Sequence, residues 1–206
     1  MTGPLTTAWR WGAWAAAGAV VLAVVWILTR PLGPADVPSG RGQAFFAIGS
    51  EREGIGIGQS APELEAMVGG HPVGLEAVDG TPVRLADLAG RPTWIVFGAT
   101  WCGPCREEIP ALRAAYQAGG ADGLQLLWVS ISETADAVAG FAADEELPFP
   151  VALDRSGAVA ERYGVWGYPT HYFIDADGVV RARYLGPMTA ELIDQYLPLI
   201  LSPAVR

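Results

Sequence analysis

Apolar and polar positions along residues 58–206 follow two alternating periods. Short apolar, β-prone segments bounded by Gly, Pro or Asp predict strands at residues 64–68, 72–78, 93–99, 124–131, 150–153, 170–175 and 179–185. Segments with apolar residues at helical spacing predict helices at residues 103–118, 135–143, 158–163 and 189–200. Strands that alternate with helices and end in a hairpin predict an α/β domain, with a mixed sheet flanked by helices on both faces.

Local signals refine two of these elements. Asp177-Gly178 is a favoured hairpin dipeptide and is expected to turn the chain between the last two strands. Ser132 or Thr134 is suited to cap the helix at residues 135–143, because either hydroxyl can accept a free backbone N–H of the first turn.

A hydrophobic segment without charges lies between Arg10 and Arg30. At ~1.5 Å of rise per residue, a helix of this length approaches the ~30 Å of a bilayer's hydrocarbon core. Tryptophans cluster near its start and Trp26 lies near its end, as in interfacial belts. We therefore predict an N-terminal transmembrane anchor over residues 1–29. The alternative is a cleaved signal peptide, although the apolar run is longer than a usual signal core and no A-x-A cleavage site follows it closely.

Residues 30–57 are rich in Gly and Pro and predict a linker, in which an apolar group at residues 44–48 could form a docking turn. Residues 58–206 then suit one domain with a single core. Arginines lie on both sides of the hydrophobic segment, so the positive-inside rule does not decide its orientation.

The composition is acidic. Aspartate and glutamate number 22 against 13 arginines, with no lysine, and the formal net charge is −9 at pH 7. Such a surface repels nucleic acid and anionic lipid headgroups, because both carry dense negative charge. We therefore expect no nucleic-acid partner.

Cys102 and Cys105 are the only cysteines in the chain, so within one molecule they can pair only with each other. A bridge between residues three apart closes a very short loop and contributes little stability on the chain-entropy account. Two thiols at this spacing instead suit thiol–disulfide exchange, in which one thiol attacks and the other resolves the mixed disulfide. The pair is therefore predicted to be a redox centre.

The pair lies where the strand predicted at residues 93–99 gives way to the helix predicted at residues 103–118. Cys102 is placed near the N-terminus of that helix, where unpaired N–H groups and the helix dipole favour a thiolate. Pro104 fits the first helical turn, since its missing N–H costs nothing there. Cys102, expected also to lie nearer the solvent, is the predicted nucleophile, and Cys105 is the predicted resolving thiol.

Two other interpretations of the pair are weaker. A zinc site would need further ligands, but the chain has no third cysteine, and His71 and His171 lack the usual local ligand spacing. Inert buried cysteines are disfavoured, because the Gly-Pro between them marks an exposed turn into a helix. His171 is interpreted as a strand residue rather than a ligand, and we predict neither a metal nor a cofactor.

Four motifs carry a resemblance to a known family. They are Trp101-Cys102-Gly103-Pro104-Cys105, the sequence QSAPEL at residues 59–64, the sequence DGTPVRLADLAG at residues 79–90, and Tyr168-Pro169-Thr170. Over residues 58–201 they resemble the thioredoxin superfamily, and most closely its membrane-anchored TlpA/ResA-like branch, related to CcmG/DsbE. Residues 138–163 resemble the insert that is characteristic of this branch.

The resemblance implies a cis peptide bond before Pro169, in a loop that lies against the cysteine pair. The predicted substrate groove then consists of residues from both motifs: Trp101, Gly103, Pro104, Tyr168, Pro169 and Thr170. Trp101 is expected to shield the nucleophile. Tyr168 is bulkier than the residue usual in the family, which leaves the choice of partner open.

Glu108 follows Cys105 by one helical turn and shares its face of the helix, whereas Glu107 points elsewhere. In ResA-like proteins a glutamate at this offset lies beneath the disulfide and assists proton transfer, so Glu108 is a candidate catalytic residue. The alternative is a solvated helix charge beside Arg106 and Glu107. Val96 stands where thioredoxin has a buried aspartate, six residues before the first cysteine, so the general-base role passes to Glu108 or to water.

The predicted function is that of a thiol–disulfide oxidoreductase, a single-pass protein of the bacterial cell membrane with its soluble domain outside the cytoplasm, where disulfides occur. Gly103-Pro104 is the dipeptide of thioredoxin and favours a reductant, with apocytochrome c or similar dithiol proteins as substrates. Because an oxidising compartment does not resupply electrons, a transmembrane donor of the CcdA/DsbD kind is also implied.

Two other functions stay open. Cys102 and Cys105 could bind Cu(I) in a copper-handling assembly factor, although no methionine or histidine lies nearby in the sequence. A peroxiredoxin-type peroxidase is the second alternative. Its P-x-x-x-T-x-x-C pattern is not met, because position 95 is isoleucine rather than proline.

Overall fold

The computed structural model describes residues 46–47, 54–120 and 123–201. The predicted anchor over residues 1–29 lies outside the described residues, as does most of the predicted linker over residues 30–57. Within the part that is described, no helix is both long and apolar enough to cross a membrane.

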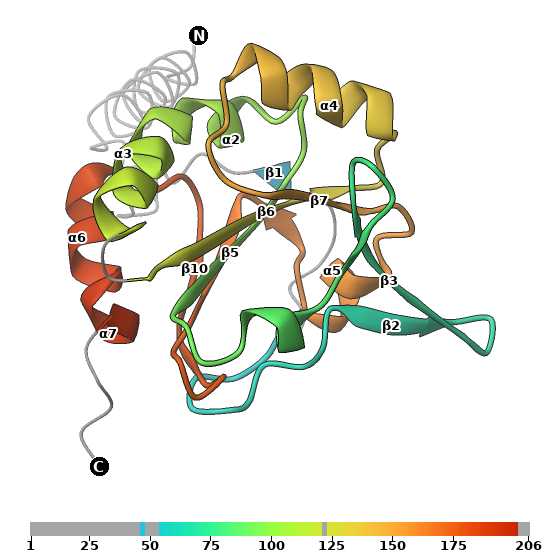
Figure 1. Ribbon diagram of the computed structural model, residues 1–206, viewed down its shortest axis with the longest axis horizontal. Coiled ribbons are helices and arrows are strands. Elements are labelled where there is room, and N and C mark those ends of the chain that lie inside the picture. Colours follow the sequence, from blue (N-terminus) through green and yellow to red (C-terminus); the bar gives the residue numbers. More distant parts are fainter. Residues whose placement is uncertain (1–45, 48–53, 121–122, 202–206) are drawn as a thin grey trace, which may run out of the picture. The chain divides into compact units, whose positions relative to one another are not determined.

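A mixed β-sheet forms the centre of the domain (Figure 1). Its strands follow the order β10-β9-β5-β6-β7-β3-β2, and β4 pairs with β3 beside this path. β5, β6 and β7 are parallel, whereas β10, β9, β3, β2 and β4 join through antiparallel pairs. The strands are β2 (Glu65–Val68), β3 (His71–Ala77), β4 (Pro82–Val83), β5 (Thr93–Gly98), β6 (Gln125–Ile131), β7 (Val151–Asp154), β9 (Thr170–Ile174) and β10 (Val180–Leu185). The predicted mixed sheet is thereby confirmed.

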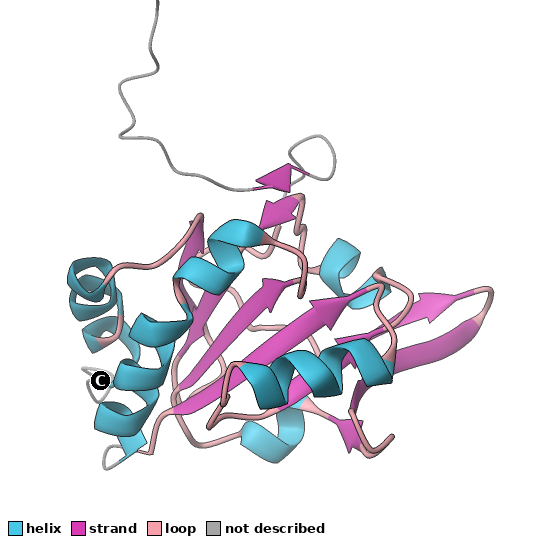
Figure 2. Ribbon diagram, turned by 90° about the horizontal axis from the view of Figure 1, so that it is seen from above, coloured by secondary structure: helices cyan, strands magenta, loops and turns pink. Residues whose placement is uncertain are grey.

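Helices cover both faces of this sheet (Figure 2). They are α2 (Gly103–Glu107), α3 (Ile109–Gly119), α4 (Ala135–Asp144), α5 (Ala158–Arg162), α6 (Ala190–Tyr196), α7 (Pro198–Leu201) and the 3-10 helix η1 (Leu85–Leu88). α3, α4 and α6 share a buried core with Trp94 and Val96 of β5. α5 and η1 pack with Ile95 and Phe97, which point to the other face. The alternation along β5 therefore builds both cores, and all six of its residues are buried.

The helix predicted at residues 103–118 is broken at Glu108, which ends α2 and precedes α3. Pro110 explains the break, because it has no N–H to donate to the carbonyl of Arg106 in a continuous helix. The N–H of Glu108 donates to that carbonyl instead. The break matters for the site, because Glu108 lies where the two helices meet.

Three further local details can be compared with the sequence prediction, and only the first differs from it. The closing helix predicted at residues 189–200 ends at Tyr196 and is followed by α7, which begins at Pro198. Of the two candidate caps for α4, Thr134 is the one used, since its hydroxyl accepts the N–H of Ala137. The hairpin between β9 and β10 does turn at Asp177-Gly178, as predicted.

Two very short strands lie outside the main sheet. β1 (Phe46–Ala47) pairs in antiparallel fashion with β8 (Gly167–Tyr168). The docking turn predicted at residues 44–48 is described only at these two positions of β1. β8 immediately precedes Pro169. The two paired strands therefore lie next to the loop of Pro169, which was expected to lie against the cysteine pair.

Candidate active site

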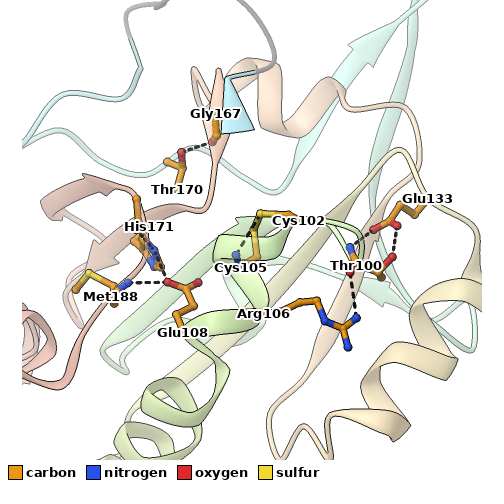
Figure 3. The surroundings of a disulfide bond; sticks show 11 residues. Thr100, Cys102, Cys105, Arg106, Glu108, Glu133, Gly167, Thr170, His171 and Met188 are labelled. Carbon is orange, nitrogen blue, oxygen red and sulfur yellow. Dashed lines mark hydrogen bonds and ion pairs between the residues drawn. A yellow bond between two sulfur atoms is a disulfide. The ribbon is translucent and has the colours of Figure 1, made fainter. Parts of the chain in front are cut away.

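A disulfide joins Cys102 to Cys105 at the junction between β5 and α2 (Figure 3). Both residues are buried, with 0 % of their surface exposed. Cys102 therefore does not lie nearer the solvent than Cys105 in this oxidised state, contrary to the sequence expectation. The reason is packing, because both cysteines belong to a buried cluster that also holds Ala99 and Tyr168.

Backbone hydrogen bonding distinguishes the two sulfurs. Cys102 is the N-cap residue of α2, and its Sγ accepts the backbone N–H of Cys105 at 3.2 Å. Gly103 and Pro104 follow it as the first residues of the helix. A thiolate at Sγ of Cys102 would be stabilised by this donor and by the positive end of the helix. The geometry therefore favours Cys102 as the sulfur that carries negative charge after reduction.

The loop around Pro169 lies beside the cysteine pair. The peptide bond between Tyr168 and Pro169 is cis, as the resemblance implies. The hydroxyl of Thr170 donates to the carbonyl of Gly167 at 2.7 Å and so ties the two sides of the loop together (Figure 3). The ring of Tyr168 lies 6.0 Å from that of Trp101, which is 56 % exposed. The structure thus brings both motifs of the predicted groove together, with Trp101 at the solvent-exposed edge.

The side chain of Tyr168 is uncharged at neutral pH. Burial raises the pKa of Tyr168 to about 12, and the nearby carboxylates of Asp154 and Glu133 add to the rise. The phenol therefore adds no negative charge beside the cysteine pair at neutral pH.

Glu108 is buried where α2 meets α3, with 2 % of its surface exposed. Its Oε2 accepts the backbone N–H of Met188 at 2.8 Å and lies 3.2 Å from Nε2 of His171. Its Oε1 is buried without a hydrogen-bond partner. Figure 3 shows the carboxylate between these partners and the cysteine pair. Burial excludes the alternative of a solvated helix charge, whereas Glu107 is exposed.

His171 lies on β9, as interpreted from the sequence, and is fully buried. Its Nδ1 accepts the indole N–H of Trp94 at 3.2 Å, and its Nε2 lies 3.0 Å from the carbonyl oxygen of Gly186. The sequence analysis missed the connection between His171 and Glu108. The sequence did contain one signal, a histidine within a mostly apolar strand. A polar side chain that such a strand buries needs polar partners, and this points to a functional or structural contact.

Glu133 is a second residue that the sequence analysis missed. Its carboxylate accepts the backbone N–H of Thr100 at 2.8 Å, the hydroxyl of Thr100 at 2.6 Å and the hydroxyl of Ser130 at 2.5 Å. Arg106 contacts the same segment, through a hydrogen bond to the carbonyl of Thr100 at 3.4 Å. Since Thr100 lies two residues before Cys102, Glu133 fixes the backbone that leads into the disulfide. The only sequence signal was an acid placed shortly after a buried strand.

The structure also describes the position of the expected general base and the grouping of possible metal ligands. Val96 is fully buried in β5, so the position where thioredoxin has an aspartate is apolar in this chain. In the described ranges, no three His, Cys, Asp or Glu side chains are grouped as metal ligands would be.

Comparisons with known proteins agree with this geometry. A sequence profile described as "AhpC/TSA family" matches residues 57–183. The thiol-disulfide oxidoreductase ResA of Bacillus cereus is 32 % identical over 155 residues, which cover 75 % of this chain and 83 % of the relative.

Solved structures with a similar fold come from Chlorobium tepidum and Mycobacterium tuberculosis. A candidate thiol:disulfide interchange protein DsbE from Chlorobium tepidum is 28 % identical with a TM-score of 0.63, and the match covers 72 % of this chain and 99 % of that one. A secreted disulfide oxidoreductase of Mycobacterium tuberculosis, homologous to E. coli DsbE, is 26 % identical with a TM-score of 0.52, covering 61 % and 91 %. The chain has a C-x-x-C disulfide at the start of a helix and a cis-proline loop beside it. Together with these matches, this shows that the chain belongs to the thioredoxin-like AhpC/TSA family and is a thiol–disulfide oxidoreductase.

Proposed function

We propose that residues 1–29 anchor this oxidoreductase in the bacterial cell membrane, and that its domain reduces disulfides of proteins outside the cytoplasm, such as apocytochrome c. The observation that carries the proposal is the asymmetric environment of the disulfide, in which only the Sγ of Cys102 caps α2. The uncharged segment between Arg10 and Arg30 supports the anchor. The description of the M. tuberculosis structure as a secreted protein supports the location.

Reduction of a partner disulfide takes two exchange steps. The thiolate of Cys102 attacks one partner sulfur, which breaks the partner's S–S bond, forms a mixed disulfide and leaves one partner thiolate. Cys105 then loses its proton and attacks Sγ of Cys102, which breaks the mixed disulfide and releases the second partner thiolate. The two partner sulfurs gain two electrons and take up two protons, and Cys102 and Cys105 are left as the disulfide.

Glu108 is proposed to take the proton of Cys105 in the second step. Its carboxylate is buried and points toward the cysteine pair (Figure 3). Its Oε1 has no hydrogen-bond partner. Because this carboxylate is buried, an internal base that accepts the proton would make the step independent of solvent access.

The direction of electron flow is proposed from the dipeptide between the cysteines. Gly103-Pro104 is the dipeptide of thioredoxin, whose potential is about −270 mV. A protein of that kind outside the cytoplasm must be re-reduced after each turnover, because its product is the disulfide form. A transmembrane donor of the CcdA/DsbD kind would supply these two electrons.

The test of the activity is complementation in the bacterium that encodes the chain. Deleting the gene should lower covalently bound haem in c-type cytochromes, and the wild-type chain should restore it, whereas Cys102→Ala and Cys105→Ala should not. The purified protein should also reduce an oxidised C-x-x-C-H peptide, the haem-attachment motif of c-type cytochromes. Unchanged cytochrome c, together with rapid peroxide consumption or tight Cu(I) binding, would replace this function with one of its two alternatives.

The location has a separate test. The protein should stay in the membrane fraction after high-salt washing, and protease added outside intact cells or spheroplasts should digest its domain. Recovery of a soluble protein that begins beyond residue 29 would show that the hydrophobic segment is a cleaved signal peptide.

A further inference from the structure

A buried imidazole connects the central sheet to the acid beside the disulfide. The side chains of His171 and Glu108 are both 0 % exposed. The imidazole ring lies 5.9 Å from the ring of Trp94 on β5 and 6.0 Å from that of Tyr184 on β10. A buried imidazole needs a partner for each ring nitrogen, because an unpaired polar atom in the core is costly.

Trp94 fixes the protonation state of this histidine. An indole N–H is only a donor, so the nitrogen that receives it must carry a lone pair rather than a proton. The nitrogen that faces Trp94 is Nδ1, at 3.2 Å. His171 is therefore neutral, with its single proton on Nε2. That proton is donated to the carbonyl oxygen of Gly186 at 3.0 Å, and Oε2 of Glu108 lies 3.2 Å from the same nitrogen.

This arrangement makes the two oxygens of Glu108 unequal. Oε2 accepts the backbone N–H of Met188 and lies 3.2 Å from the protonated Nε2 of His171, so positive partial charge is gathered beside it. Oε1 has no hydrogen-bond partner, although it is buried. A proton that arrives at the carboxylate would therefore bind Oε1, since Oε2 already accepts the N–H of Met188 and lies beside Nε2 of His171.

We propose that His171 is a positioning residue for the exchange reaction: held by Trp94 as the neutral Nε2–H tautomer, it fixes Oε2 of Glu108 and leaves Oε1 to exchange a proton with the cysteine pair. This rests on the role of Glu108 in the proposed function. His171 does not itself accept or donate a proton during turnover.

In the resolving step, the S–H bond of Cys105 breaks and its proton binds Oε1, which converts the carboxylate of Glu108 into the acid. The thiolate of Cys105 then forms the S–S bond with Cys102 and displaces the partner thiolate. Glu108 afterwards returns its proton to a leaving thiolate or to solvent. Charge and electrons balance without a further reactant.

Few other titratable groups face this pair in the part of the chain that the structure describes. Tyr184 of β10 lies against the imidazole, and Cys105 of α2 lies on the disulfide side of Glu108. β5 contributes Trp94, and the loop after β10 contributes backbone groups of Gly186 and Met188, none of which titrates. Tyrosine side chains titrate near pH 10, so a profile measured below pH 9 reports on the cysteines and Glu108.

The experiment measures the pH dependence of the resolving step in the full-length, reduced protein. Reaction with DTNB releases one thionitrobenzoate when Cys102 attacks and a second when Cys105 resolves the mixed disulfide. His171→Leu removes the N–H group that lies beside Oε2, and His171→Gln can keep an N–H group near the position of Nε2. His71→Gln is the matched control, because His71 is exposed on β3.

His171→Leu should move the midpoint of the second phase to higher pH by about one unit, because the negative carboxylate loses a neighbouring N–H dipole that stabilises it. His171→Gln should restore most of the wild-type profile, and His71→Gln should not change it. In a Glu108→Gln background, His171→Leu should cause no further shift. If Glu108→Gln changes the profile but His171→Leu does not, the role of His171 is wrong and that of Glu108 stands. If Glu108→Gln changes nothing, the role of Glu108 itself fails.

A second measurement needs no substitution at His171. The chain has only two histidines, so ¹⁵N spectra of the labelled, detergent-solubilised protein give two sets of imidazole signals, which the His71→Gln variant assigns. His171 should show an unprotonated Nδ1 and a protonated Nε2 at pH 7, because Nδ1 accepts the indole N–H of Trp94. An imidazolium at this pH, or the Nδ1–H tautomer, would overturn the proposal even if the variants failed to fold.

Discussion

The backbone N–H of Cys105 points at the Sγ of Cys102, 3.2 Å away, in addition to the covalent bond that joins the two side chains. The donor belongs to the backbone of the first turn of α2, so it stays in place when the disulfide is reduced. A thiolate on Cys102 can therefore accept this N–H as soon as it forms. The sulfur of Cys105 does not cap the helix in this way. This relationship, rather than solvent exposure, separates the roles of two equally buried cysteines.

The first prediction is that Cys105→Ala traps substrate proteins as mixed disulfides and Cys102→Ala traps none. The attacking thiolate of Cys102 still forms the mixed disulfide in the first variant, but no second thiol is left to resolve it. The measurement is non-reducing electrophoresis of affinity-purified variants from cells, followed by release of the partners with dithiothreitol. Equal trapping by both variants would contradict the assignment.

The second prediction concerns the reduction potential of the Cys102–Cys105 pair. We expect a value nearer thioredoxin, at about −270 mV, than DsbA, at about −120 mV, because the intervening dipeptide is Gly-Pro. Equilibration of the protein with a series of glutathione or dithiothreitol buffers gives the value. A potential above about −180 mV, that of protein disulfide isomerase, would rule out the proposed direction of electron flow.

Much of the fold follows from local patterns in the sequence. The apolar run of β5, the Asp177-Gly178 turn and the Thr134 cap are each specified by a few adjacent residues, and the structure contains all three. The cis bond before Pro169 is different, because nothing local favours it and only the resemblance to a family implied it.

The site could be predicted only in part, because its polar contacts join distant positions. Cys102 and Cys105 are only three residues apart in the chain and were visible as a motif. Trp94 and His171 are 77 residues apart, and the contact between Glu108 and the backbone of Met188 spans 80 residues. Helical spacing placed Glu108 on the face of Cys105, but only the packing of β9 and the loop after β10 buries it.

The third prediction concerns Glu133, which fixes the segment before the disulfide. Glu133→Leu removes both acceptor oxygens, so the backbone N–H of Thr100 and the hydroxyls of Thr100 and Ser130 lose this acceptor. We expect the free energy of unfolding of the oxidised protein to fall by about 1–3 kcal/mol, the range for a polar group left without its hydrogen-bond partner. Urea denaturation followed by tryptophan fluorescence measures it.

Glu107→Leu is the control for this measurement, because Glu107 is exposed on α2. A surface substitution of this kind should change the free energy of unfolding by no more than about 0.5 kcal/mol. If both variants are equally stable, the contacts of Glu133 with Thr100 do not hold the segment that leads into Cys102.

The last prediction concerns Glu108 and the reactivity of the reduced cysteines. Glu108→Gln keeps the size of the side chain and an oxygen that can accept the N–H of Met188, but it removes the capacity to exchange a proton. We expect it to change the pH dependence of Cys102 alkylation between about pH 5 and 10, because a negative charge buried beside the pair disfavours a second one on a sulfur. Glu107→Gln, on the solvent side of α2, should leave the profile close to that of the wild type. Rates of iodoacetamide alkylation, with the far-UV circular dichroism of each variant as a check on folding, provide the comparison. Superimposable profiles for the wild type and Glu108→Gln would mean that the buried carboxylate only supports the packing between α3 and β9, and that the proton of Cys105 leaves through solvent.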